Sequence, residues 1–261
     1  MIKMINLTAD NYFSTVANQN FMSVSQFKAF EKCHASALAE INGEYEREQT
    51  IPMLVGSYVD AHFDGTLQKF ITENASKILK KDGSLKSEFI QAKQIISRIE
   101  KDKMMMEYMS GKQQVIMTGT INGVAIKIMI DHLHDDKIVD RKIVKDFAPI
   151  YAEDKGLVPW FEAWEYDLQG AVYQEIVRQN TGNKLPFYLG AATKEKITDL
   201  DIVHITQDYL DFAMERFTRD VEFYDAIKKG IIQPERCDKC EYCKGSKILT
   251  EPTKAEDYYL L

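Results

Sequence analysis

The sequence predicts an α/β fold in which helices flank a mixed central sheet. Residues 23–110 carry apolar side chains at the spacing of amphipathic helices, whereas residues 114–144 are rich in β-branched residues and alternate between apolar and polar positions. Beyond residue 160 the helical spacing returns, followed by two short apolar runs and a further helical stretch. Helices, a sheet of hairpins, a helix and further strands, in that order, make an α/β domain with a mixed sheet.

Three helices are expected in the first part of the chain. The first covers residues 23–41, with Ser23 or Ser25 capping its start. A second begins near Gly56, and a third covers residues 88–110. In each, apolar side chains recur every three or four residues, so that one stripe faces the core. The three stripes are Phe27, Phe30, Cys33 and Ala37; Val59, Phe63, Leu67 and Phe70; and Ile95, Ile99 and Met106.

Three consecutive antiparallel strands are expected over residues 114–144. Asn122-Gly123 is a strong tight-turn dipeptide, and the polar stretch 134–137 supplies a second turn. The rest of the sequence predicts a helix over 160–179, strands over 187–192 and 201–205, and a long helix over 208–229.

The chain is long enough for one large domain. Its 261 residues are 45% hydrophobic and 11% aromatic, which is ordinary for a globular protein and too apolar for a disordered one. No internal repeat and no linker rich in proline, glycine or serine divides the sequence. We expect a single domain over 1–261, with a mainly helical part at 1–110, the sheet and its helices at 111–229, and a cysteine-containing tail at 230–261.

Charge and hydropathy exclude two classes of protein. The 33 basic and 40 acidic side chains give a net charge of −7, which excludes a polybasic protein but is compatible with a local basic groove for DNA. No segment approaches the ~20 apolar residues that span a bilayer, and the longest aliphatic stretch, Val124–Ile130, contains Lys127. The first residues lack the apolar run of a signal peptide. We therefore expect a cytoplasmic protein without a membrane partner.

Residues 126–144 place charged side chains on one face of a hairpin. If the Asp-Asp dipeptide between the two strands forms the loop, counting outward sets Asp131 directly opposite Asp140. Lys142, two residues beyond Asp140, shares their face. The other face is aliphatic and is expected to face the core. Arg141 is its one charged member and needs a partner or a route to solvent.

The two opposed carboxylates predict a cation site. Their Cβ atoms would lie about 5 Å apart, and the charges would repel unless the pair is solvated, shares a proton or holds a divalent cation. Carboxylate oxygens suit hard cations such as Mg²⁺ or Mn²⁺. Lys142 would then orient a water or stabilise negative charge developing on phosphorus. The alternative is an ordinary solvated polar face on an edge hairpin.

The hairpin resembles the active-site signature of a known nuclease superfamily. Asp131, followed on the next strand by Asp140-Arg141-Lys142, is similar to the D…(D/E)-x-K pattern of the PD-(D/E)XK nucleases. Ile130 stands where the superfamily's name calls for a proline, which is often absent. The resemblance implies a restriction-endonuclease-like core and metal-dependent hydrolysis of DNA phosphodiesters.

Two further motifs occur in the order found in the RecB-like and RecE-like branch of this superfamily. Gln169 and Tyr173 resemble its Q-x-x-x-Y helix motif, and residues four apart share one helix face. Gly56 to Asp60 resembles its G-x-x-x-(H/E/D) motif, which implies that Asp60 is a further metal ligand. His62, two residues later, would point to another side of the helix. Taken alone, the Gln169–Tyr173 motif fits an ordinary amphipathic helix better.

The cysteines form a separate pattern. Cys237, Cys240 and Cys243 make a C-x2-C-x2-C cluster that can bring three sulfurs to one metal, and Cys33 is the only other cysteine. Cas4 and AddB nucleases, which this arrangement resembles, join an early helical cysteine to a C-terminal trio around a [4Fe–4S] cluster. Their trio is usually spaced C-x2-C-x5-C, so zinc held by four cysteines stays open as the alternative. For Cys33, an ordinary buried position on a helix also stays open.

Together these motifs predict a metal-dependent DNA exonuclease that digests linear DNA, similar to the phage and prophage exonucleases related to RecE, which serve recombination or repair. Asp131 and Asp140 would bind one or two Mg²⁺ ions with help from Asp60, and Lys142 would position the attacking water. The Q-x-x-x-Y pair would orient the DNA or support the ligands.

Other expectations are less specific. Lys145 and Lys194 are candidate phosphate contacts, and Trp160 and Trp164 are candidates for base stacking, although helix packing is the simpler explanation for both tryptophans. The resemblance further implies a ring-shaped homo-oligomer and a recombination partner protein. Two alternatives stay open: a catalytically inert DNA-binding or assembly module of the same fold, and a Cas4-like nuclease that trims single strands.

Overall fold

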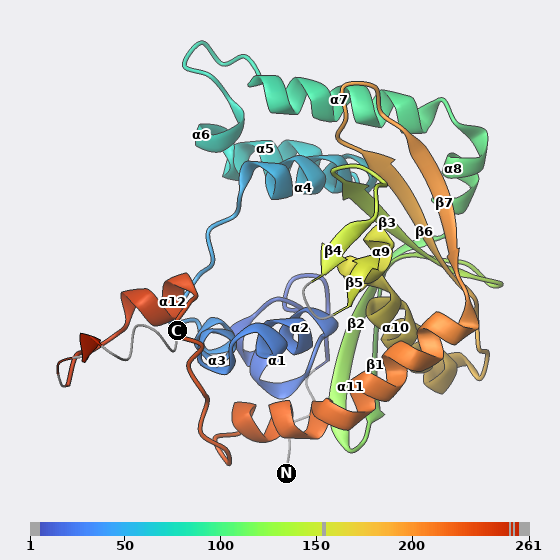
Figure 1. Cartoon of the computed structure of the whole chain (residues 1–261). Helices are drawn as coiled ribbons and strands as arrows, with labels where there is room; N and C mark the ends of the chain where they lie inside the picture. The colour runs from blue at the N-terminus through green and yellow to red at the C-terminus, as the bar shows by residue number, and fades with distance from the viewer. Residues whose placement is uncertain (1–5, 153–154, 251, 253, 256–261) are drawn as a thin grey trace.

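A mixed β-sheet with helices on both faces forms the centre of the computed structural model, which describes residues 6–152, 155–250, 252 and 254–255 (Figure 1). Its strands are β1 Lys112–Ile121, β2 Val124–Leu133, β3 Ile138–Val144, β6 Phe187–Thr193 and β7 Leu200–Ile205. In this part of the chain they form one five-stranded sheet in the order β1-β2-β3-β6-β7. β3 and β6 run parallel and the other neighbours antiparallel. The predicted fold class is confirmed.

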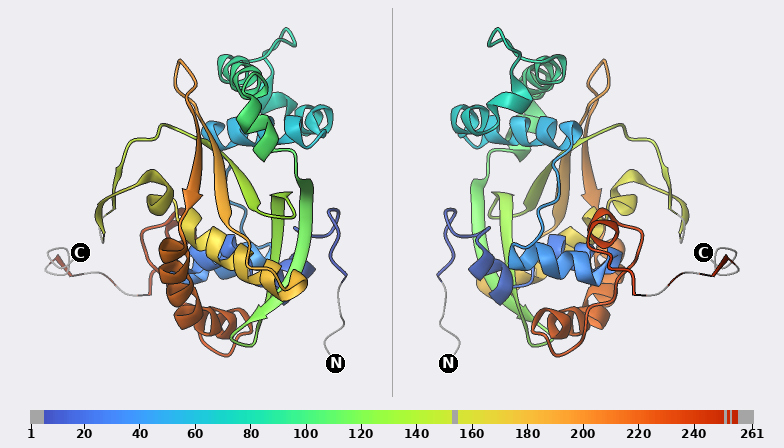
Figure 2. Two further views of the ribbon diagram at one scale, coloured as in Figure 1. Left: turned by 90° about the vertical axis from the view of Figure 1, so that its right-hand side faces the viewer. Right: turned by 90° about the vertical axis from the view of Figure 1, so that its left-hand side faces the viewer.

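Helices cover both faces of the sheet because neighbouring residues of a strand point to opposite sides. The helices are α1 Thr15–Asn20, α2 Val24–Lys32, α3 His34–Asn42, α4 Ile51–Phe63, α5 Leu67–Glu73, α6 Ala75–Ile78, α7 Ser87–Glu100, α8 Lys103–Tyr108, α9 Trp160–Ala163, α10 Tyr166–Thr181, α11 Gln207–Lys228 and α12 Glu241–Gly245. On β6, Ala191 belongs to an apolar cluster with α2, α10 and α11, and Ala192 to a second cluster with α4, α7 and α8. Figure 2 shows α4–α8 at one end of the molecule and α11 at the other.

The three consecutive antiparallel strands expected from the sequence are β1, β2 and β3. Asn122 and Gly123 form the first turn with φ values of 46° and 76°, the left-handed conformation that a two-residue hairpin turn requires. The second turn is closed by a 2.9 Å hydrogen bond from His134 N to Lys137 O. Both turns lie at the predicted residues.

β2 and β3, which are both fully described, pair next to their turn and separate beyond it. His132 pairs with Val139, and the same register sets Asp131 opposite Asp140. From there β3 continues beside β6 along its whole length, whereas β2 continues beside β1. The separation of the two strands leaves both carboxylates room for partners from the helices.

The first and third of the predicted helices are each divided into two shorter helices. The helix expected over 23–41 consists of α2 and α3, because Cys33 between them is extended, with φ −167° and ψ 114°. The helix expected over 88–110 is divided at Asp102, whose side chain caps the start of α8.

The remaining differences also concern helix ends and short elements. The helix expected from Gly56, with an apolar stripe reaching Phe70, begins earlier, at Ile51, and is divided after Phe63 into α4 and α5. The helix expected over 160–179 is divided at Glu165, whose φ of 56° lies in the left-handed region that L-residues rarely adopt. Elements that the sequence did not predict are α1, α6, α12 and a hairpin of β4 Ile150–Ala152 and β5 Gly156–Val158.

Two expectations concern the chain termini and membranes. The described residues contain no helix with both the length and the apolarity to cross a bilayer. The expectation about a signal peptide falls partly on residues 1–5, and the end of the predicted cysteine-containing tail on 256–261. Both ranges lie outside the described residues.

Candidate active site

The carboxylate of Asp140 lies where β2 and β3 separate and is held by two side chains. Asp140 is only 2% exposed. Its Oδ1 accepts a 2.7 Å hydrogen bond from Gln169 Nε2 on α10, and its Oδ2 forms an ion pair with Lys142 Nζ. The structure thus brings together three predicted site residues, Asp140, Lys142 and Gln169.

Burial and neighbouring charges govern the protonation of this pair. Burial raises the pKa of Asp140 above its usual range, the charges of Asp131 and Asp60 add to the effect, and Lys142 opposes it. Burial alone would lower the pKa of Lys142, but the carboxylates of Asp140 and Asp131 outweigh burial and raise that pKa. Lys142 therefore stays charged, and negative charge is concentrated around it. A second cation would find favourable potential here.

Asp131 faces the same space from β2 and is half-buried. Its Oδ2 accepts a 3.0 Å hydrogen bond from the backbone N of Arg141, which fixes the side chain against β3. Nε2 of Gln114, on β1, lies 3.5 Å from the other oxygen of Asp131, Oδ1. The same Nε2 donates to Asp64 Oδ2 at 3.1 Å. Gln114 has a φ of 50°, a conformation that costs energy in a residue other than glycine and that clusters at functional sites.

Arg141 finds the partners that the sequence required of it. Its guanidinium, which is buried, donates to Asp60 Oδ1 at 2.8 Å and to Asp64 Oδ1 at 2.9 Å. Asp60 lies on α4, and Asp64 directly follows the helix, one turn later. The predicted metal ligand Asp60 therefore gives one oxygen to Arg141, while its side chain remains 45% exposed. His62 pairs instead with Glu100 on α7, in agreement with its exclusion from the site.

Helix α10 carries both residues of the Q-x-x-x-Y motif and lies very close to the sheet. Tyr173 donates a 2.9 Å hydrogen bond to Met129 O on β2, one helical turn from Gln169. Close approach depends on Gly170, where an added Cβ would lie 2.4 Å from Cδ1 of Phe187 on β6. The missing side chain lets the helix approach β6 closely at the turn that carries Gln169.

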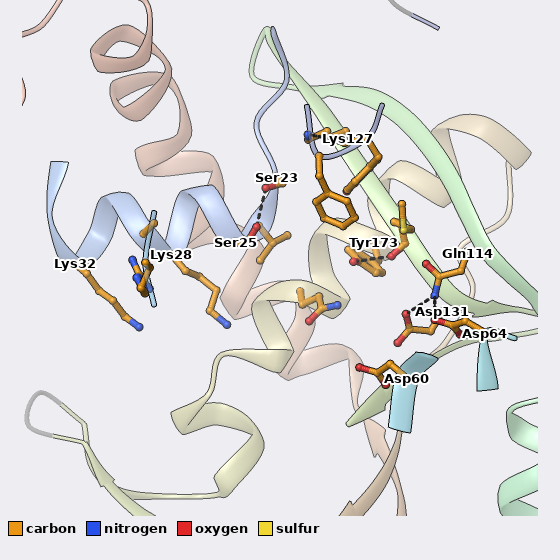
Figure 3. A pocket seen from close by; sticks show the side chains of 17 residues that line it. Ser23, Ser25, Lys28, Lys32, Asp60, Asp64, Gln114, Lys127, Asp131 and Tyr173 are labelled. Carbon is orange, nitrogen blue, oxygen red and sulfur yellow. Dashed lines mark hydrogen bonds between the residues drawn. The ribbon is translucent and has the colours of Figure 1, made fainter. Parts of the chain in front are cut away.

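Two cavities open on either side of Asp60. The first, of about 560 Å³, is lined by Asp60, Asp64 and Asp131 at one side and by Lys28 and Lys32 of α2 at the other (Figure 3). The second, of about 770 Å³, contains Lys142 together with the predicted phosphate and base contacts; these are Lys145, Lys194 and Trp164.

The two tryptophans have different environments. Trp160 is 5% exposed and packs against Phe147 and Phe161, so it fills the core as helix packing predicts. Trp164 is 53% exposed and lines the second cavity. Tyr166, on the following turn, lies under Lys142 Nζ at 4.8 Å from its ring centroid.

The carboxylates suit a hard divalent cation by their chemistry. Asp131 and Asp140 supply oxygen donors beside a buried excess of negative charge. The cysteines, however, are the only described set of three or more His, Cys, Asp or Glu residues whose ligand atoms all lie within 4.8 Å of one another. Asp60, tied to Arg141, does not complete such a set with Asp131 and Asp140.

The four cysteines come together, as their spacing and the resemblance predicted. All four sulfurs lie within 4.8 Å of one another, with Cys33 Sγ 3.5 Å and Cys237 Sγ 4.0 Å from Cys243 Sγ. Backbone N–H groups lower the pKa of Cys237 to about 6, whereas burial raises that of Cys243 to about 12. A bound cation would stabilise all four as thiolates. The group can hold a metal ion or cluster.

Sequence reasoning missed several residues of this site. Asp64 had a signal, since it follows Asp60 by four residues and shares its helix face. Gln114 had none, because its role depends on a local backbone distortion. Lys127, which interrupts the aliphatic stretch of β2, is 1% exposed, because the segment around Tyr12 covers it.

Comparisons with known proteins agree with this geometry. The family model described as "PDDEXK-like domain of unknown function (DUF3799)" matches residues 23–246. A crystal structure from Eubacterium rectale, described as "Putative exonuclease", is 40% identical with a TM-score of 0.92, covering 97% of this chain and 98% of that chain. A second solved structure is 11% identical with a TM-score of 0.33, and no curated protein matches. The chain belongs to the PDDEXK-like family DUF3799.

Proposed function

We propose that this protein is a metal-dependent DNA exonuclease. The observation that carries the proposal is the arrangement of Gln169, Asp140 and Lys142, with Asp131 opposite, at the point where two strands separate. The Eubacterium rectale protein, similar over nearly the whole chain, is described as a "Putative exonuclease". Linear DNA as substrate and a role in phage-type recombination or repair are parts of the same proposal.

Asp131 and Asp140 would hold Mg²⁺ or Mn²⁺, and the exposed oxygen of Asp60 is available as a further ligand. Such an ion supplies a nucleophilic water at neutral pH and neutralises charge on the phosphoryl oxygens. Gln169 orients Asp140 through its amide, and Tyr173 fixes the helix to β2.

Lys142 has the position and the charge for the role expected of it. Its ammonium pairs with Asp140 and remains protonated because two carboxylates raise its pKa. From the same strand face it can orient a water toward phosphorus or neutralise the charge that develops there. Tyr166 beneath the ammonium limits the directions in which the side chain can move.

Digestion of end-labelled linear duplex DNA with Mg²⁺ tests the proposal directly. We expect the wild type to release short products, Asp140→Asn to release none, and Asp135→Asn, an exposed carboxylate of the same hairpin, to behave as the wild type. Equal products from all three proteins, or no products from any of them, would contradict the proposal.

Two other activities predict different outcomes with the same variants. A Cas4-like trimming nuclease would digest single-stranded overhangs and leave blunt duplex intact, with the same dependence on Asp140. A catalytically inert module would bind DNA and digest no substrate. Comparing blunt, overhang and covalently closed circular DNA distinguishes these outcomes, since an exonuclease spares the circle. A homo-oligomer and a recombination partner stay predictions of the resemblance, testable by light scattering and co-purification.

The sulfur spacing supports a single ion in the cysteine site. A tetrahedral zinc with Zn–S bonds of about 2.3 Å separates its sulfurs by roughly 3.8 Å, close to the 3.5 Å and 4.0 Å separations at Cys243. A [4Fe–4S] cluster places a different iron atom at each sulfur and therefore needs wider spacing. Metal analysis after anaerobic purification distinguishes the two, and iron in excess of zinc would contradict the single-ion assignment.

We also propose that the whole chain acts as one nuclease domain. The two apolar clusters meet on opposite faces of β6 through Ala191 and Ala192. Neither group of helices therefore has a sheet of its own. A single calorimetric transition, with equal van't Hoff and calorimetric enthalpies, is the expected result.

A further inference from the structure

The first cavity is lined by basic side chains on the side away from its carboxylates. Figure 3 shows Lys28 and Lys32 projecting from α2 on one side, while Asp60, Asp64 and Asp131 face the other. Arg47 and Lys127 also line this cavity. A polyanion fits a pocket with acidic groups at one end and basic groups at the other in only one placement. The reacting phosphate of the polyanion then lies at the acidic, metal-binding end, and the neighbouring phosphates lie at the basic end.

The basic groups differ in how far other protein groups already neutralise them. Arg47 pairs with Glu40 at 2.7 Å, and Lys28 donates to Trp164 O at 2.6 Å with Glu165 at 3.9 Å. Lys32 is exposed and has no ion-pair partner among the described residues. Lys32 is therefore the cation whose charge is most available to a phosphate.

Lys127 fixes an aromatic side chain at the mouth of this pocket. It is 1% exposed, donates to Tyr12 O and to Asn18 Oδ1 at 2.7 Å, and its ammonium lies 4.5 Å from the Tyr12 ring centroid. Burial lowers the pKa of Lys127 to about 8. Burying an ammonium group costs free energy unless hydrogen bonds compensate for the lost water. The hydrogen bonds of Lys127 do so, and they hold the Tyr12 segment against β2.

Phe13, next to that anchor, is exposed although it is large and apolar. Its side chain is 74% exposed, lines the first cavity, and meets the Tyr12 ring edge to face at 4.9 Å. Exposed aromatic rings beside basic groups are the surfaces on which single-stranded nucleic acids stack their bases. The described residues of the first cavity thus combine phosphate contacts with a flat apolar platform.

We propose that this pocket binds an unpaired segment of the DNA strand, with phosphates along Lys28 and Lys32 and one base stacked on Phe13. The inference rests on the proposed nuclease function and specifies its substrate. Inside a duplex both faces of a base are covered by its neighbours, so away from a duplex end a ring at this position selects unpaired nucleotides. The enzyme would therefore hold the strand as a single strand on one side of the reacting phosphate.

Binding of a fluorescein-labelled single-stranded oligonucleotide, measured by anisotropy with Ca²⁺ in place of Mg²⁺, tests the base contact. We expect Phe13→Ala to weaken binding between about fivefold and a hundredfold. Val16→Ala, which shortens a 56% exposed apolar side chain of α1 outside the cavity, serves as the matched control. An oligonucleotide with abasic sites at every position should bind wild type and Phe13→Ala equally.

The phosphate contact has its own readout. Lys32→Ala should reduce the slope of log affinity against log salt by about 0.7, the value for one phosphate of a single strand. Lys69→Ala, a 76% exposed lysine of α5, should leave the slope unchanged. Phe13→Ala should alter affinity and keep the slope.

Three outcomes would overturn the inference. The first is equal affinity of wild type and Phe13→Ala for the single strand. The second and third are a loss of affinity in Phe13→Ala that is just as large on abasic strands, or on a fully paired closed hairpin, as on the single strand. Failure of the nuclease function looks different. Base-dependent binding without digestion would reject the proposed activity alone, and digestion without base-dependent binding would reject this inference alone.

Discussion

Gln169 on α10 donates a 2.7 Å hydrogen bond to Oδ1 of Asp140 on β3, and Lys142 pairs with the second oxygen of the same carboxylate. With one donor on each oxygen, the orientation of the carboxylate is fixed before any substrate arrives. Pre-set orientation of charged groups is a main source of rate enhancement in enzymes. The helix therefore takes part in the site through a residue that need not touch DNA.

Removing this amide should slow the reaction and leave the fold intact. A hydrogen bond to a charged group contributes about 1.5–3 kcal/mol, so Gln169→Ala is expected to reduce kcat by roughly tenfold to a hundredfold. The control is Gln179→Ala, a substitution on the same helix that loses hydrogen bonds to Thr120 of β1. Unchanged kcat in Gln169→Ala, at the wild-type melting temperature, would show that the amide is dispensable.

Arg141 should matter for stability more than for chemistry. Its buried guanidinium compensates Asp60 and Asp64, so Arg141→Met leaves carboxylates without their cation and is expected to lower the free energy of unfolding by about 3–5 kcal/mol. Arg219→Met, whose 69% exposed side chain pairs with Asp220, should cost at most about 1 kcal/mol. Urea unfolding measures both. Equal effects of the two substitutions would contradict the role assigned to Arg141.

Loss of one cysteine should remove the metal and loosen the tail. Cys33→Ser is expected to bind less than a tenth of the wild-type metal and to melt at a lower temperature, because the bound ion closes the long loop between Cys33 and Cys237. Ser36→Ala, on the next turn of α3, controls for local packing. Elemental analysis and calorimetry, with and without a chelator, check the prediction. A chelator that lowers the melting temperature of Cys33→Ser as much as that of the wild type would contradict it.

A buried lysine should make stability depend on pH. Burial lowers the pKa of Lys228 to about 7, and its ammonium donates to Phe21 O and Gln26 Oε1. Between pH 7 and pH ~10 the unfolded chain still binds the proton that the folded protein has lost, so rising pH favours the folded state. Relative to Lys228→Met, the wild type should gain stability from pH 7 to pH 9 in urea titrations. A constant difference would refute the prediction, and Lys229→Met, 58% exposed, controls for loss of a charge.

The parts of the site that lie on the hairpin were predictable because their signals are local. Two turn dipeptides and strict alternation determine the register, and the register alone sets Asp131 opposite Asp140. Arg141, the charged residue on the aliphatic face, required either a partner or a route to solvent, and it has two partners, Asp60 and Asp64. The fold class followed from the order of helical and alternating segments.

The parts that escaped prediction depend on contacts between distant segments. Where the first predicted helix is divided at Cys33, Ala35 N donates a 3.0 Å hydrogen bond to Glu235 O. Where the later helix is divided at Glu165, the side chain of Glu165 forms a 2.7 Å ion pair with Arg216. Lys127 is buried by a segment more than a hundred residues away in sequence. No local pattern specifies such partners, so helix breaks and pocket walls appear only in three dimensions.

Helix α2, which forms the basic wall of the pocket, depends on the last segments of the chain. Phe27 stacks on Phe217 of α11 at 4.5 Å, and Cys33 at the end of α2 meets Cys243. During synthesis, Asp131 and Asp140 leave the ribosome before both of these supports, Phe217 and Cys243. A nascent chain would thus carry its carboxylates before it can bind a strand, and the proposed DNA-degrading activity would begin only once the chain has been synthesised as far as Cys243.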